Sequence, residues 1–481
     1  MRIALVVPGR GRRVNSGLGR LFRPLVLRHQ TIGPLLIAAA LENQQHQVQV
    51  IDAEAEELGD RSLVRAIASF GPDLIGVYAN LILIRHVLRT VHSLKQAFPE
   101  VPLIAGGPCV TSIPEALLAH SSFDYGVIGE GEATIVELTN AIEGRSDLES
   151  VRGIVFKREG QIVRTPDRPN EANLDSLPMP AWRHVRFELY RDIIVGNRRF
   201  ANVLLNRGCP YHCLFCDPKS KLGQRPRFRS IDSIVEELAY LRSRFGVENV
   251  YFNDDTFTLN REQILGFCER LLSDGLDISW ECRTRVDLVD YELLSMMRRA
   301  GCEMIGFGVE SGDNGVLRSL RKGITIEQTQ DAFEACKRAG VDTLAYFMVG
   351  GPVETRETAR RTVKFASRIE PTYIVPAQCR VFPPGTDLVR IAVERGLIFA
   401  DHWEQRVWRD PGCVAPCFVT GEMSRPLAVL YLARLHALNM LWPARNLRSM
   451  LRGHVASNFK SRLLVGLQVI LLAVDRKRLL T

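Results

Sequence analysis

Asn206-Arg-Gly-Cys209-Pro-Tyr-His-Cys213-Leu-Phe-Cys216 sets three cysteines in a CxxxCxxC spacing. Thiolates this close in sequence can converge on one side of a loop, and soft sulfur ligands favour iron–sulfur clusters and zinc over hard cations. Three ligands for the four irons of a [4Fe–4S] cluster would leave one iron open to a small molecule. The alternative is structural zinc, which normally takes four ligands with a second pair further along the chain. His212 would complete such a set only in a strained position.

The composition is that of an ordinary globular protein long enough for two or three domains, with 481 residues, 46% hydrophobic and 24% charged. The eleven cysteines show no disulfide-framework spacing, which favours a reducing cytoplasm where an oxygen-sensitive cluster survives. We expect neither a signal peptide nor a membrane-spanning helix. The net charge of +8 permits anionic lipid or nucleic acid as a partner, although solvated surface is its commoner meaning.

Residues 1–145 alternate short apolar runs with helix-length amphipathic segments. The runs are 3–7, 48–51, 74–78, 103–105 and 125–128. This alternation predicts an α/β, doubly wound, Rossmann-like parallel sheet, in which a ligand lies beyond the carboxyl ends of the strands. Glycines at these ends let the backbone approach a large ligand closely. The residues expected there are Pro8, Asp52, Gly106, Gly107, Gly129 and Glu130.

Residues 146–200 are expected to link this domain to the next. The stretch 153–163 alternates around Glu159-Gly160, which predicts a hairpin. The proline-rich stretch 174–182 predicts an extended segment.

Residues 201–385 show six strand-like runs separated by amphipathic helices. The runs are 203–205, 250–252, 278–282, 304–309, 344–349 and 373–379. Six such repeats predict a partial (β/α)6 TIM-type barrel, whose chemistry lies on the loops that follow the strands. The cysteine motif follows the first run, as that rule requires.

Polar residues follow other strands of this barrel. Asp254 and Asp255 suit a cationic ligand, although Asp255 or Thr256 could instead cap the following helix. Arg283 suits a carboxylate. Glu310 ends a strand of small and apolar residues, where a structural ion pair is the alternative to a binding role.

The cysteine motif, with Phe215 directly before the third cysteine, resembles the cluster loop of the radical S-adenosylmethionine (SAM) enzymes. The turns Gly106-Gly-Pro and Gly129-Glu-Gly-Glu resemble those of the cobalamin (B12)-binding domain that precedes the barrel in one subgroup. The Asp-x-His-x-x-Gly motif that gives cobalt a histidine ligand in other cobalamin proteins is absent, so cobalamin would bind without that histidine. A Rossmann-type domain with no cofactor is the alternative.

The resemblance implies a role for each candidate residue. The cluster would be held by Cys209, Cys213 and Cys216. Asp254 and Asp255 would hold the SAM amino group, with Arg283 at its carboxylate. The full set expected to line SAM is Phe215, Asp254, Asp255, Arg283, Glu310 at the ribose, and Gly350 on the adenine side. The set expected to line cobalamin is Pro8, Asp52, Gly106, Gly107, Gly129 and Glu130.

The resemblance also implies a reaction. A reduced cluster would cleave SAM, and the 5′-deoxyadenosyl radical would abstract hydrogen from an unactivated carbon, to which cobalamin would deliver a methyl group. The enzyme would be a C-methyltransferase for a lipophilic or secondary-metabolite small molecule, with flavodoxin or ferredoxin as electron donor. The alternatives are an oxidative cyclase or ring-rearranging enzyme for a tetrapyrrole or isoprenoid, and a non-catalytic metal-binding scaffold. No nucleic acid partner is expected, because no recognisable RNA-binding module follows the barrel.

Residues 386–481 are expected to be mostly helical. The apolar segments 427–441 and 463–474 have basic flanks. They can cover the barrel and complete its core, or they can lie on the inner face of an anionic membrane, in which case the substrate would be lipophilic. Cys413 and Cys417 are too few for a second cluster.

Overall fold

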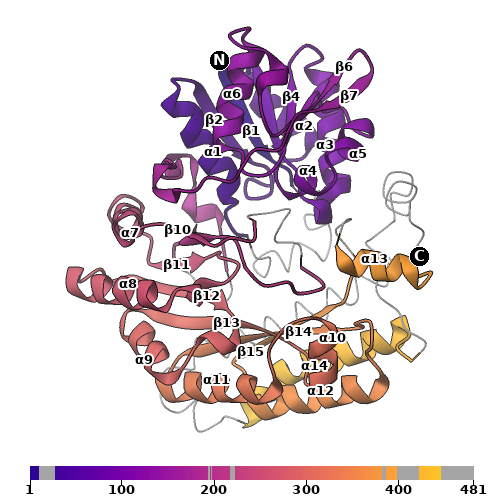
Figure 1. The fold of residues 1–481 in the computed structure, drawn as a ribbon. Coiled ribbons are helices and arrows are strands. Elements are labelled where there is room, and N and C mark those ends of the chain that lie inside the picture. Colours follow the sequence, from indigo (N-terminus) through magenta and orange to yellow (C-terminus); the bar gives the residue numbers. More distant parts are fainter. Residues whose placement is uncertain are drawn as a thin grey trace.

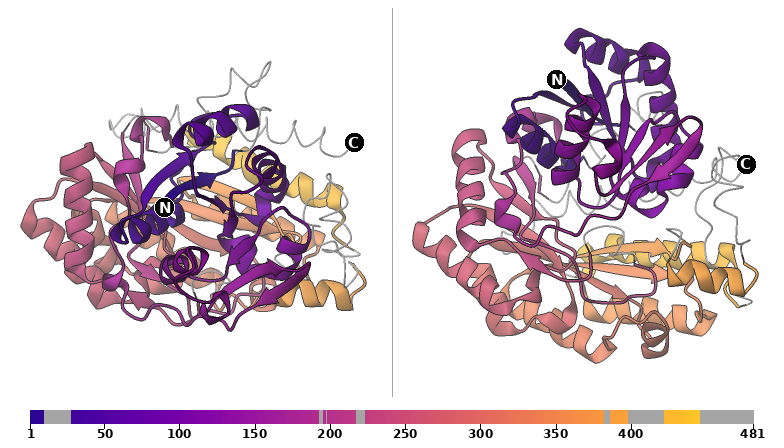
Figure 2. Two further views of the ribbon diagram at one scale, coloured as in Figure 1. Left: turned by 90° about the horizontal axis from the view of Figure 1, so that it is seen from above. Right: turned by 45° about the horizontal axis from the view of Figure 1, so that its top comes forward.

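Two large β-sheets organise the chain, one above the other in Figure 1. The computed structural model describes residues 1–9, 28–192, 195–196, 198–216, 223–381, 386–397 and 422–445, with side chains of the last segment described to residue 439. Seen from above, the domain built on the first sheet lies over the second sheet (Figure 2).

The first sheet is the expected doubly wound sheet. Its parallel strands are β1 (Arg2–Val7), β2 (Gln47–Asp52), β3 (Leu74–Tyr78), β4 (Leu103–Gly106) and β5 (Tyr125–Val127). They are ordered β2-β1-β3-β4-β5, so the direction of winding reverses between β1 and β3. Such a reversal is the point where open α/β sheets bind ligands.

Helices cover both faces of this sheet. One face carries α1 (Ile32–Asn43) and α6 (Glu132–Ile142), and the other carries α2 (Asp60–Phe70), α3 (Ile84–Ala97), α4 (Pro108–Ser112) and α5 (Pro114–Ala119). Successive side chains of a strand point to opposite faces. Ile3 and Leu5 of β1 therefore pack toward α1 and α6, while Ala4 and Val6 pack toward the other four helices.

The hairpin expected between the domains extends this first sheet. It consists of β6 (Ile154–Arg158) and β7 (Gln161–Arg164), and β6 pairs antiparallel with β5. Ile154 is fully buried on one face of the sheet and Val155 on the other. The hairpin thus adds to both layers of the first core.

The second sheet is the expected six-stranded partial barrel, with every neighbouring pair parallel. In spatial order its strands are β15 (Tyr373–Gln378), β14 (Asp342–Val349), β13 (Cys302–Glu310), β12 (Ser279–Thr284), β11 (Asn249–Phe252) and β8 (Phe200–Val203). The helices are α7 (Ile231–Phe245), α8 (Arg261–Asp274), α9 (Tyr291–Arg299), α10 (Asn314–Ser319), α11 (Ile326–Ala339) and α12 (Arg356–Ile369). A short antiparallel ribbon, β9 (Asn206–Arg207) with β10 (Arg227–Phe228), frames the cysteine loop.

Buried aromatic side chains fix β11 and β12 against α8. Phe252, Phe257, Phe267 and Trp280 are fully buried, and the Phe252 and Phe257 ring centroids lie 4.8 Å apart. Trp280 contacts all three phenylalanines. The loops after β11 and β12 therefore start from a rigid base.

The inner face of the barrel is more open than its outer face. Along β14, Leu344, Tyr346 and Met348 are partly accessible, whereas Ala345 and Phe347 are buried. The buried set packs on the surrounding helices. The accessible set faces the barrel interior, because alternate residues of a strand point to opposite faces.

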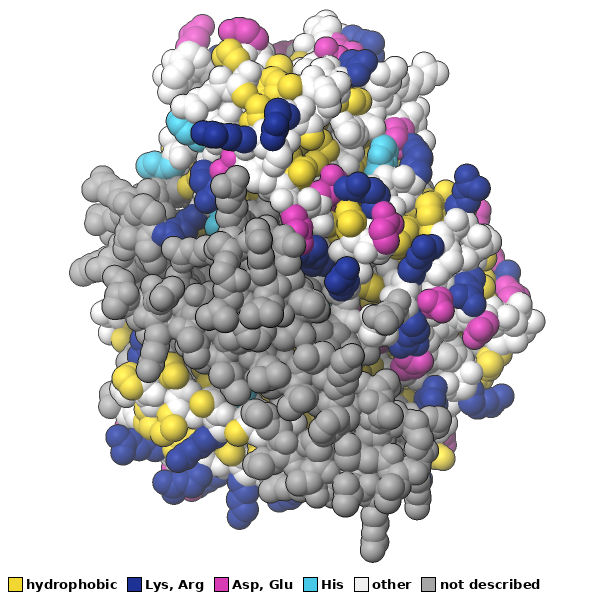
Figure 3. Space-filling view, turned by 180° about the vertical axis from the view of Figure 1, so that it is seen from behind, with side chains coloured by type: hydrophobic (Ala, Val, Ile, Leu, Met, Phe, Trp, Pro, Cys, Tyr) yellow, Lys and Arg dark blue, Asp and Glu magenta, His cyan; other side chains and the backbone are white. Residues whose placement is uncertain are grey.

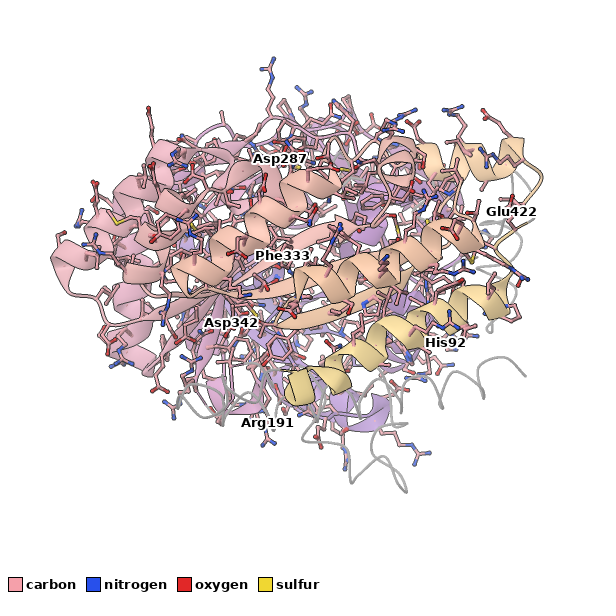
Figure 4. All side chains as sticks on the ribbon, turned by 90° about the horizontal axis from the view of Figure 1, so that it is seen from below. His92, Arg191, Asp287, Phe333, Asp342 and Glu422 are labelled. Atoms are coloured by element: carbon pink, nitrogen blue, oxygen red, sulfur yellow. The ribbon has the colours of Figure 1, made fainter. Side chains whose placement is uncertain are left out.

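The helix expected at 427–441 completes the barrel core. It is α14 (Arg425–Arg445), and it lies beside α12 in the view from below (Figure 4). The buried Asn439 accepts a hydrogen bond from the Ile374 N–H and donates one to the Ile374 carbonyl, each at 2.8 Å. This pairing covers the edge strand β15.

Other expectations for the carboxyl-terminal region lie outside the described residues, namely the second apolar segment 463–474, Cys413 and Cys417. In the part of the chain that the structure describes, no helix is both long and apolar enough to cross a membrane. Seen from behind, Lys and Arg stand beside Asp and Glu over much of the described surface (Figure 3). The described part of that face therefore carries mixed charge.

Candidate active site

The cysteine loop leaves the barrel sheet at the carboxyl end of β8. Gly208, directly before the first cysteine, has a φ of +95°. A Cβ at this position would lie 2.6 Å from the Arg225 carbonyl oxygen, so the position requires glycine. The Cys209 N–H donates to the Gly223 carbonyl at 3.1 Å. The loop therefore starts from a defined turn against the β9–β10 ribbon.

The three motif cysteines differ from the other cysteines in accessibility. Cys209 and Cys213 are half-buried and Cys216 is exposed, whereas the other six cysteines in the described part of the chain are buried. Within that part, no group of three His, Cys, Asp or Glu side chains is placed so that it could hold a metal ion.

The donor set nevertheless fits an iron–sulfur cluster better than zinc. The three accessible thiols lie on one loop, and the residue that would complete a zinc set is engaged elsewhere. His212 is exposed, with its Nδ1 3.1 Å from the Gln224 side-chain nitrogen. Three sulfur ligands without a fourth match a cluster with one open iron.

A buried cation from the loop after β12 supports the cysteine loop. Arg285 lies over the Tyr211 ring, with its Cζ 3.6 Å from the ring centroid, and it binds Asp287 at 2.9 Å. Burial raises the pKa of the Cys213 thiol, and the positive charges of Lys322 and Arg285 oppose that rise. Lys322 and Arg285 therefore favour the thiolate form of Cys213, although burial has the larger effect and the pKa stays raised.

Glu310 takes an unusual backbone conformation at the end of β13. Its φ is +62°, and the register with β14 shifts between Gly308 and Glu310. The buried carboxylate pairs with Lys322 at 2.9 Å, so the structural ion pair foreseen as an alternative is present. A Cβ on Gly308 would lie 2.5 Å from the Lys322 Nζ, so glycine makes room for the pair. Left-handed non-glycine residues cost on the order of 1–3 kcal/mol and cluster at binding sites.

Replacing Lys322 with methionine should destabilise the protein by roughly 3 kcal/mol, because Glu310 would remain buried without its partner. Urea unfolding measures this change. Adding Glu310→Gln should restore much of the loss. The control is Lys337→Met, whose exposed pair with Glu370 at 3.8 Å should contribute less than about 1 kcal/mol. Equal losses for the two lysine variants would contradict this assignment.

Asp254 is buried beneath the exit of β8. Its Oδ1 accepts the backbone N–H groups of Leu205, at 3.0 Å, and Asn206. Its Oδ2 has no hydrogen-bond partner among the described residues. Burial raises the pKa of the carboxyl to about 7. A buried carboxylate oxygen of this kind fits a cationic group such as the SAM amino group.

Thr256, two residues after Asp254, lies in the loop that follows β11 and contacts the cysteine loop. Its Oγ1 lies 3.6 Å from the Cys209 sulfur and donates to the Asp255 carbonyl at 2.8 Å. The expected capping of the next helix by Asp255 or Thr256 is wrong. Asn260 caps α8, because the chain makes a further short turn before that helix begins, and its side chain accepts from the Gln263 N–H.

Gly350 directly follows β14 and has a φ of +90°. Its N–H donates to the Glu354 carboxylate, and the Gly351 N–H donates to the same oxygen at 3.4 Å. Burial raises the pKa of Glu354 to about 7. This turn therefore depends on a buried acid whose charge changes near neutral pH.

Glu354→Gln should remove a pH dependence of stability. The pKa of this carboxyl is higher in the folded protein than in the unfolded chain, where it is about 4.5. Its contribution to the free energy of unfolding is therefore full below pH 4.5 and is lost as the pH rises through 7. Between pH 5 and pH 8, the free energy of unfolding of the wild-type protein, measured with urea, should therefore fall by roughly 2 kcal/mol more than that of the variant. Parallel pH profiles for the two proteins would refute this.

Arg283 is more exposed than the buried carboxylates Asp254, Glu310 and Glu354. Its guanidinium carbon is 4.9 Å from the Tyr251 ring centroid and 5.3 Å from that of Tyr346. It is the second-last residue of β12, and it faces the barrel interior because Cys282 and Thr284 on either side of it are buried. Its expected role at the SAM carboxylate stays a prediction.

In the first domain, a pocket of about 190 Å³ lies at the switch point between β1 and β3. Pro8 and Asp52 line it, as expected, together with His29 and Tyr190. The Tyr190 hydroxyl donates to Asp52 at 3.0 Å, and burial raises the pKa of that carboxyl. The pocket joins strand ends of the first domain to the segment that leads into the barrel, so it can take part of a large ligand held between the two domains.

The expected glycines of the first domain lie outside this pocket. Gly107 has a φ of +100°, and a Cβ there would lie 2.8 Å from the ring of Tyr78, which lines the pocket. Gly129 has a φ of +76° and donates its N–H to Thr111 at 3.0 Å. These two glycines, with Gly106 at the end of β4, shape the strand ends beside the pocket.

Glu130 belongs to a buried ion-pair cluster between the domains. It binds Arg207 at 3.2 Å and Arg227 at 2.8 Å, and Arg207 also binds Glu132 at 2.6 Å. A further N–H, from Glu171, donates to Glu130 at 2.8 Å. Because Arg207 lies two residues before Cys209, this interdomain ion-pair cluster ties the β5–α6 turn to the start of the cysteine loop.

Sequence reasoning missed several of these residues. Arg207 lies inside the motif stretch, so its proximity to the cysteines was a usable signal. Lys322 follows α10, and nothing local indicates that it returns to Glu310. Tyr190 lies in a segment without periodicity, so its contact with Asp52 had no sequence signal.

Comparison with known proteins matches both halves of the chain. Residues 203–366 match the radical SAM superfamily, and residues 22–139 match the B12 binding domain. An uncharacterized methyltransferase of Pyrococcus horikoshii is 31% identical over 436 residues, covering 90% of this chain and 92% of the relative. An anaerobic magnesium-protoporphyrin IX monomethyl ester cyclase of Rubrivivax gelatinosus is 32% identical, covering 66% of this chain and 58% of the relative.

A solved structure has the same fold. It is the radical SAM methyltransferase TsrM of Kitasatospora setae, with cobalamin and a [4Fe–4S] cluster bound, and it is 22% identical with a TM-score of 0.66. The match covers 82% of this chain and 75% of TsrM. These comparisons confirm the expected fold class, the enzymatic character and the cofactor set of the family. The chain belongs to the radical SAM superfamily, in the family of cobalamin-dependent radical SAM methyltransferases that carry a B12-binding domain before the barrel.

Proposed function

We propose that this protein methylates an unactivated carbon of a small molecule, using a [4Fe–4S] cluster, SAM and cobalamin. The observation that carries the proposal is the placement of the cysteine loop. It lies at the carboxyl edge of the barrel, and Arg207 joins its start to the strand-end turn of the B12-binding domain. Bound there, the cluster would supply reductive cleavage of SAM and cobalamin would supply the methyl group.

Residues of this chain would bind and orient these groups. Cys209, Cys213 and Cys216 would hold the cluster, since they are the accessible thiols of the described chain. The free oxygen of Asp254 would accept the SAM amino group, with Asp255 beside it. Asp52, with Pro8, would line one part of the cobalamin site at the first sheet.

The remaining expected positions have supporting roles in this proposal. The strained Glu310 would present its carboxylate to the ribose while Lys322 holds it in place. Phe215 would lie between the cluster and Lys322, whose Nζ is 5.8 Å from its ring centroid. Gly350 would form the adenine-side turn that Glu354 stabilises.

Product analysis of anaerobically reconstituted enzyme tests the reaction type. The enzyme would receive SAM with a deuterated methyl group, a reductant and a small-molecule extract. We expect paired formation of 5′-deoxyadenosine and S-adenosylhomocysteine, and a small molecule that has gained the labelled methyl group. S-adenosylhomocysteine without any labelled product, or neither nucleoside, would contradict methyl transfer.

A radical-based oxidative cyclisation or ring rearrangement is the second candidate. The match to a magnesium-protoporphyrin ester cyclase at 32% identity favours it, although this chain spans little more than half of that relative. In the same experiment, a cyclase would form 5′-deoxyadenosine without S-adenosylhomocysteine. The ratio of the two nucleosides therefore separates the candidates.

The proposal includes an electron donor such as flavodoxin or ferredoxin, and a cytoplasmic location, because a cluster of this kind requires a reducing compartment. The proposal also includes contact of the basic carboxyl-terminal tail with the inner membrane face. Protein that makes this contact should float with anionic vesicles. Protein that stays at the bottom of the gradient would exclude such contact.

A further inference from the structure

Arg283 is a barrel cation without a carboxylate partner in the described part of the chain. Three other cations near the barrel strands have one within ion-pair distance: Arg198 with Glu303 at 2.7 Å, Arg285 with Asp287 at 2.9 Å, and Lys322 with Glu310 at 2.9 Å. Unlike Arg285 and Lys322, which are buried, Arg283 keeps exposed surface and is available to a counter-charge from outside the chain. The unpaired positive charge of Arg283 therefore suggests that a ligand supplies the counter-charge.

The surroundings of Arg283 fix its direction. The guanidinium carbon lies near both tyrosine rings, 4.9 Å from the Tyr251 centroid and 5.3 Å from the Tyr346 centroid, and the guanidinium donates toward the Tyr346 hydroxyl. Its Cγ lies close to Gly306, where a Cβ would be 3.2 Å away. Although protein surrounds the side chain, Arg283 keeps an exposed surface. Its accessible surface therefore lies on the inner side of the barrel sheet, opposite the buried Cys282 and Thr284.

The carboxyl nearest in sequence does not neutralise this charge. Glu281 lies two residues before Arg283 on the same face of β12, and no ion pair joins them. Burial, with the nearby Asp192, raises the pKa of Glu281 to about 8. At neutral pH Glu281 is therefore mostly protonated, and Arg283 keeps its full positive charge.

The facing part of the inner surface is apolar. Leu344 and Met348 of β14 are partly accessible, and Val375 of β15 is 40% exposed with Ala377 also exposed. Apolar side chains on the inner face of a barrel strand can make contact with a ligand's hydrocarbon part. The interior thus has a cationic wall at β12 and an apolar wall at β14 and β15.

We propose that the substrate is an amphipathic anion, whose carboxylate or phosphate-type group pairs with Arg283 and whose apolar part lies against β14 and β15. This inference rests on the proposed function, since it names the substrate class of the same site. A guanidinium flanked by two tyrosines favours a planar oxyanion that can accept two hydrogen bonds. A wholly apolar lipid would leave Arg283 unpaired.

Binding of matched probe pairs tests the proposal without turnover. The probes are indole-3-propionate with its amide, and decanoate with its amide, measured by ligand-observed NMR on reconstituted enzyme at pH 7 with SAM and no reductant. Wild-type enzyme should bind each carboxylate at least about tenfold more tightly than its amide. Arg283→Gln should reduce that ratio to near one, and Arg283→Lys should keep part of it.

Two controls make the result specific. Arg244→Gln removes the same charge from the exposed end of α7 and should keep the wild-type ratio. Arg283→Gln should retain the cluster absorption and the wild-type affinity for SAM. An unchanged ratio in Arg283→Gln, equal binding of carboxylates and amides, or no carboxylate binding at millimolar concentration would overturn the proposal.

A loss of SAM affinity in Arg283→Gln would also overturn it, because Arg283 would then serve the SAM carboxylate. Since no reductant is present, none of these outcomes depends on methyl transfer. Failure of the proposed reaction would appear only in the nucleoside products.

Discussion

Protein carrying Cys213→Ser, reconstituted with iron and sulfide without oxygen, should lack the brown cluster absorption and should cleave SAM at least about 10³-fold more slowly than wild type. Cys213 is the central thiol of the three that are accessible in the described chain. Two remaining thiolates cannot complete the three-ligand set of a cluster with one open iron. Iron and sulfide content, absorption at visible wavelengths and 5′-deoxyadenosine formation measure the effect.

Cys336→Ala is the matched control. Cys336 is fully buried in α11, so its removal leaves a small cavity that should cost roughly 1 kcal/mol without loss of iron. A full cluster in the Cys213→Ser protein would contradict the assignment of the loop. Loss of iron in both variants would show that unfolding, and not ligand loss, is responsible.

Arg207→Met should destabilise the junction of the two domains by roughly 4 kcal/mol. The substitution leaves Glu132 buried without its partner and removes one of the two arginines that bind Glu130. Removing one member of a buried ion pair costs about 3–5 kcal/mol, because the other charge remains uncompensated. Urea unfolding measures the loss, and hydrogen exchange should locate it at residues 129–132 and 206–208.

Adding Glu132→Gln to Arg207→Met should recover part of this loss, because the uncompensated charge is removed. Arg145→Met is the control, since Arg145 is exposed and its pair with Glu143 at 3.2 Å should contribute less than about 1 kcal/mol. Equal effects of the two arginine substitutions would show that the interdomain ion-pair cluster contributes no more than a surface pair.

The architecture could be predicted from the sequence because the patterns that indicate strands and helices are local. Alternating strand and helix patterns predicted both sheets, and the strand expected at 74–78 is β3. Boundaries elsewhere moved by a few residues, as at β8, where the strand ends at Val203 before a second short pairing at Asn206–Arg207. The hairpin was predicted, but its pairing with β5 was not, because register with a distant strand has no local signal.

Side-chain partners were harder to predict because they join residues far apart in the chain. Glu130 was expected at cobalamin, and its ion pairs with Arg207 and Arg227, 77 and 97 positions away, were not predicted. Arg283 lies near the carboxyl end of β12, as expected, but the tyrosines that contact it come from β11 and β14 and had no local signal. Glu310 pairs with Lys322 while its own backbone has a positive φ. Neither feature has a local signal in the sequence.

Cofactor analysis of protein purified without oxygen tests the central claim most directly. The absorption spectrum, with iron and sulfide assays and extraction of cobalamin, should show one [4Fe–4S] cluster and one cobalamin per chain. Cys213→Ser protein should keep the cobalamin and lose the cluster. A wild-type protein that holds a cluster but takes up no cobalamin, even when cobalamin is supplied, would contradict a cobalamin-dependent methyltransferase.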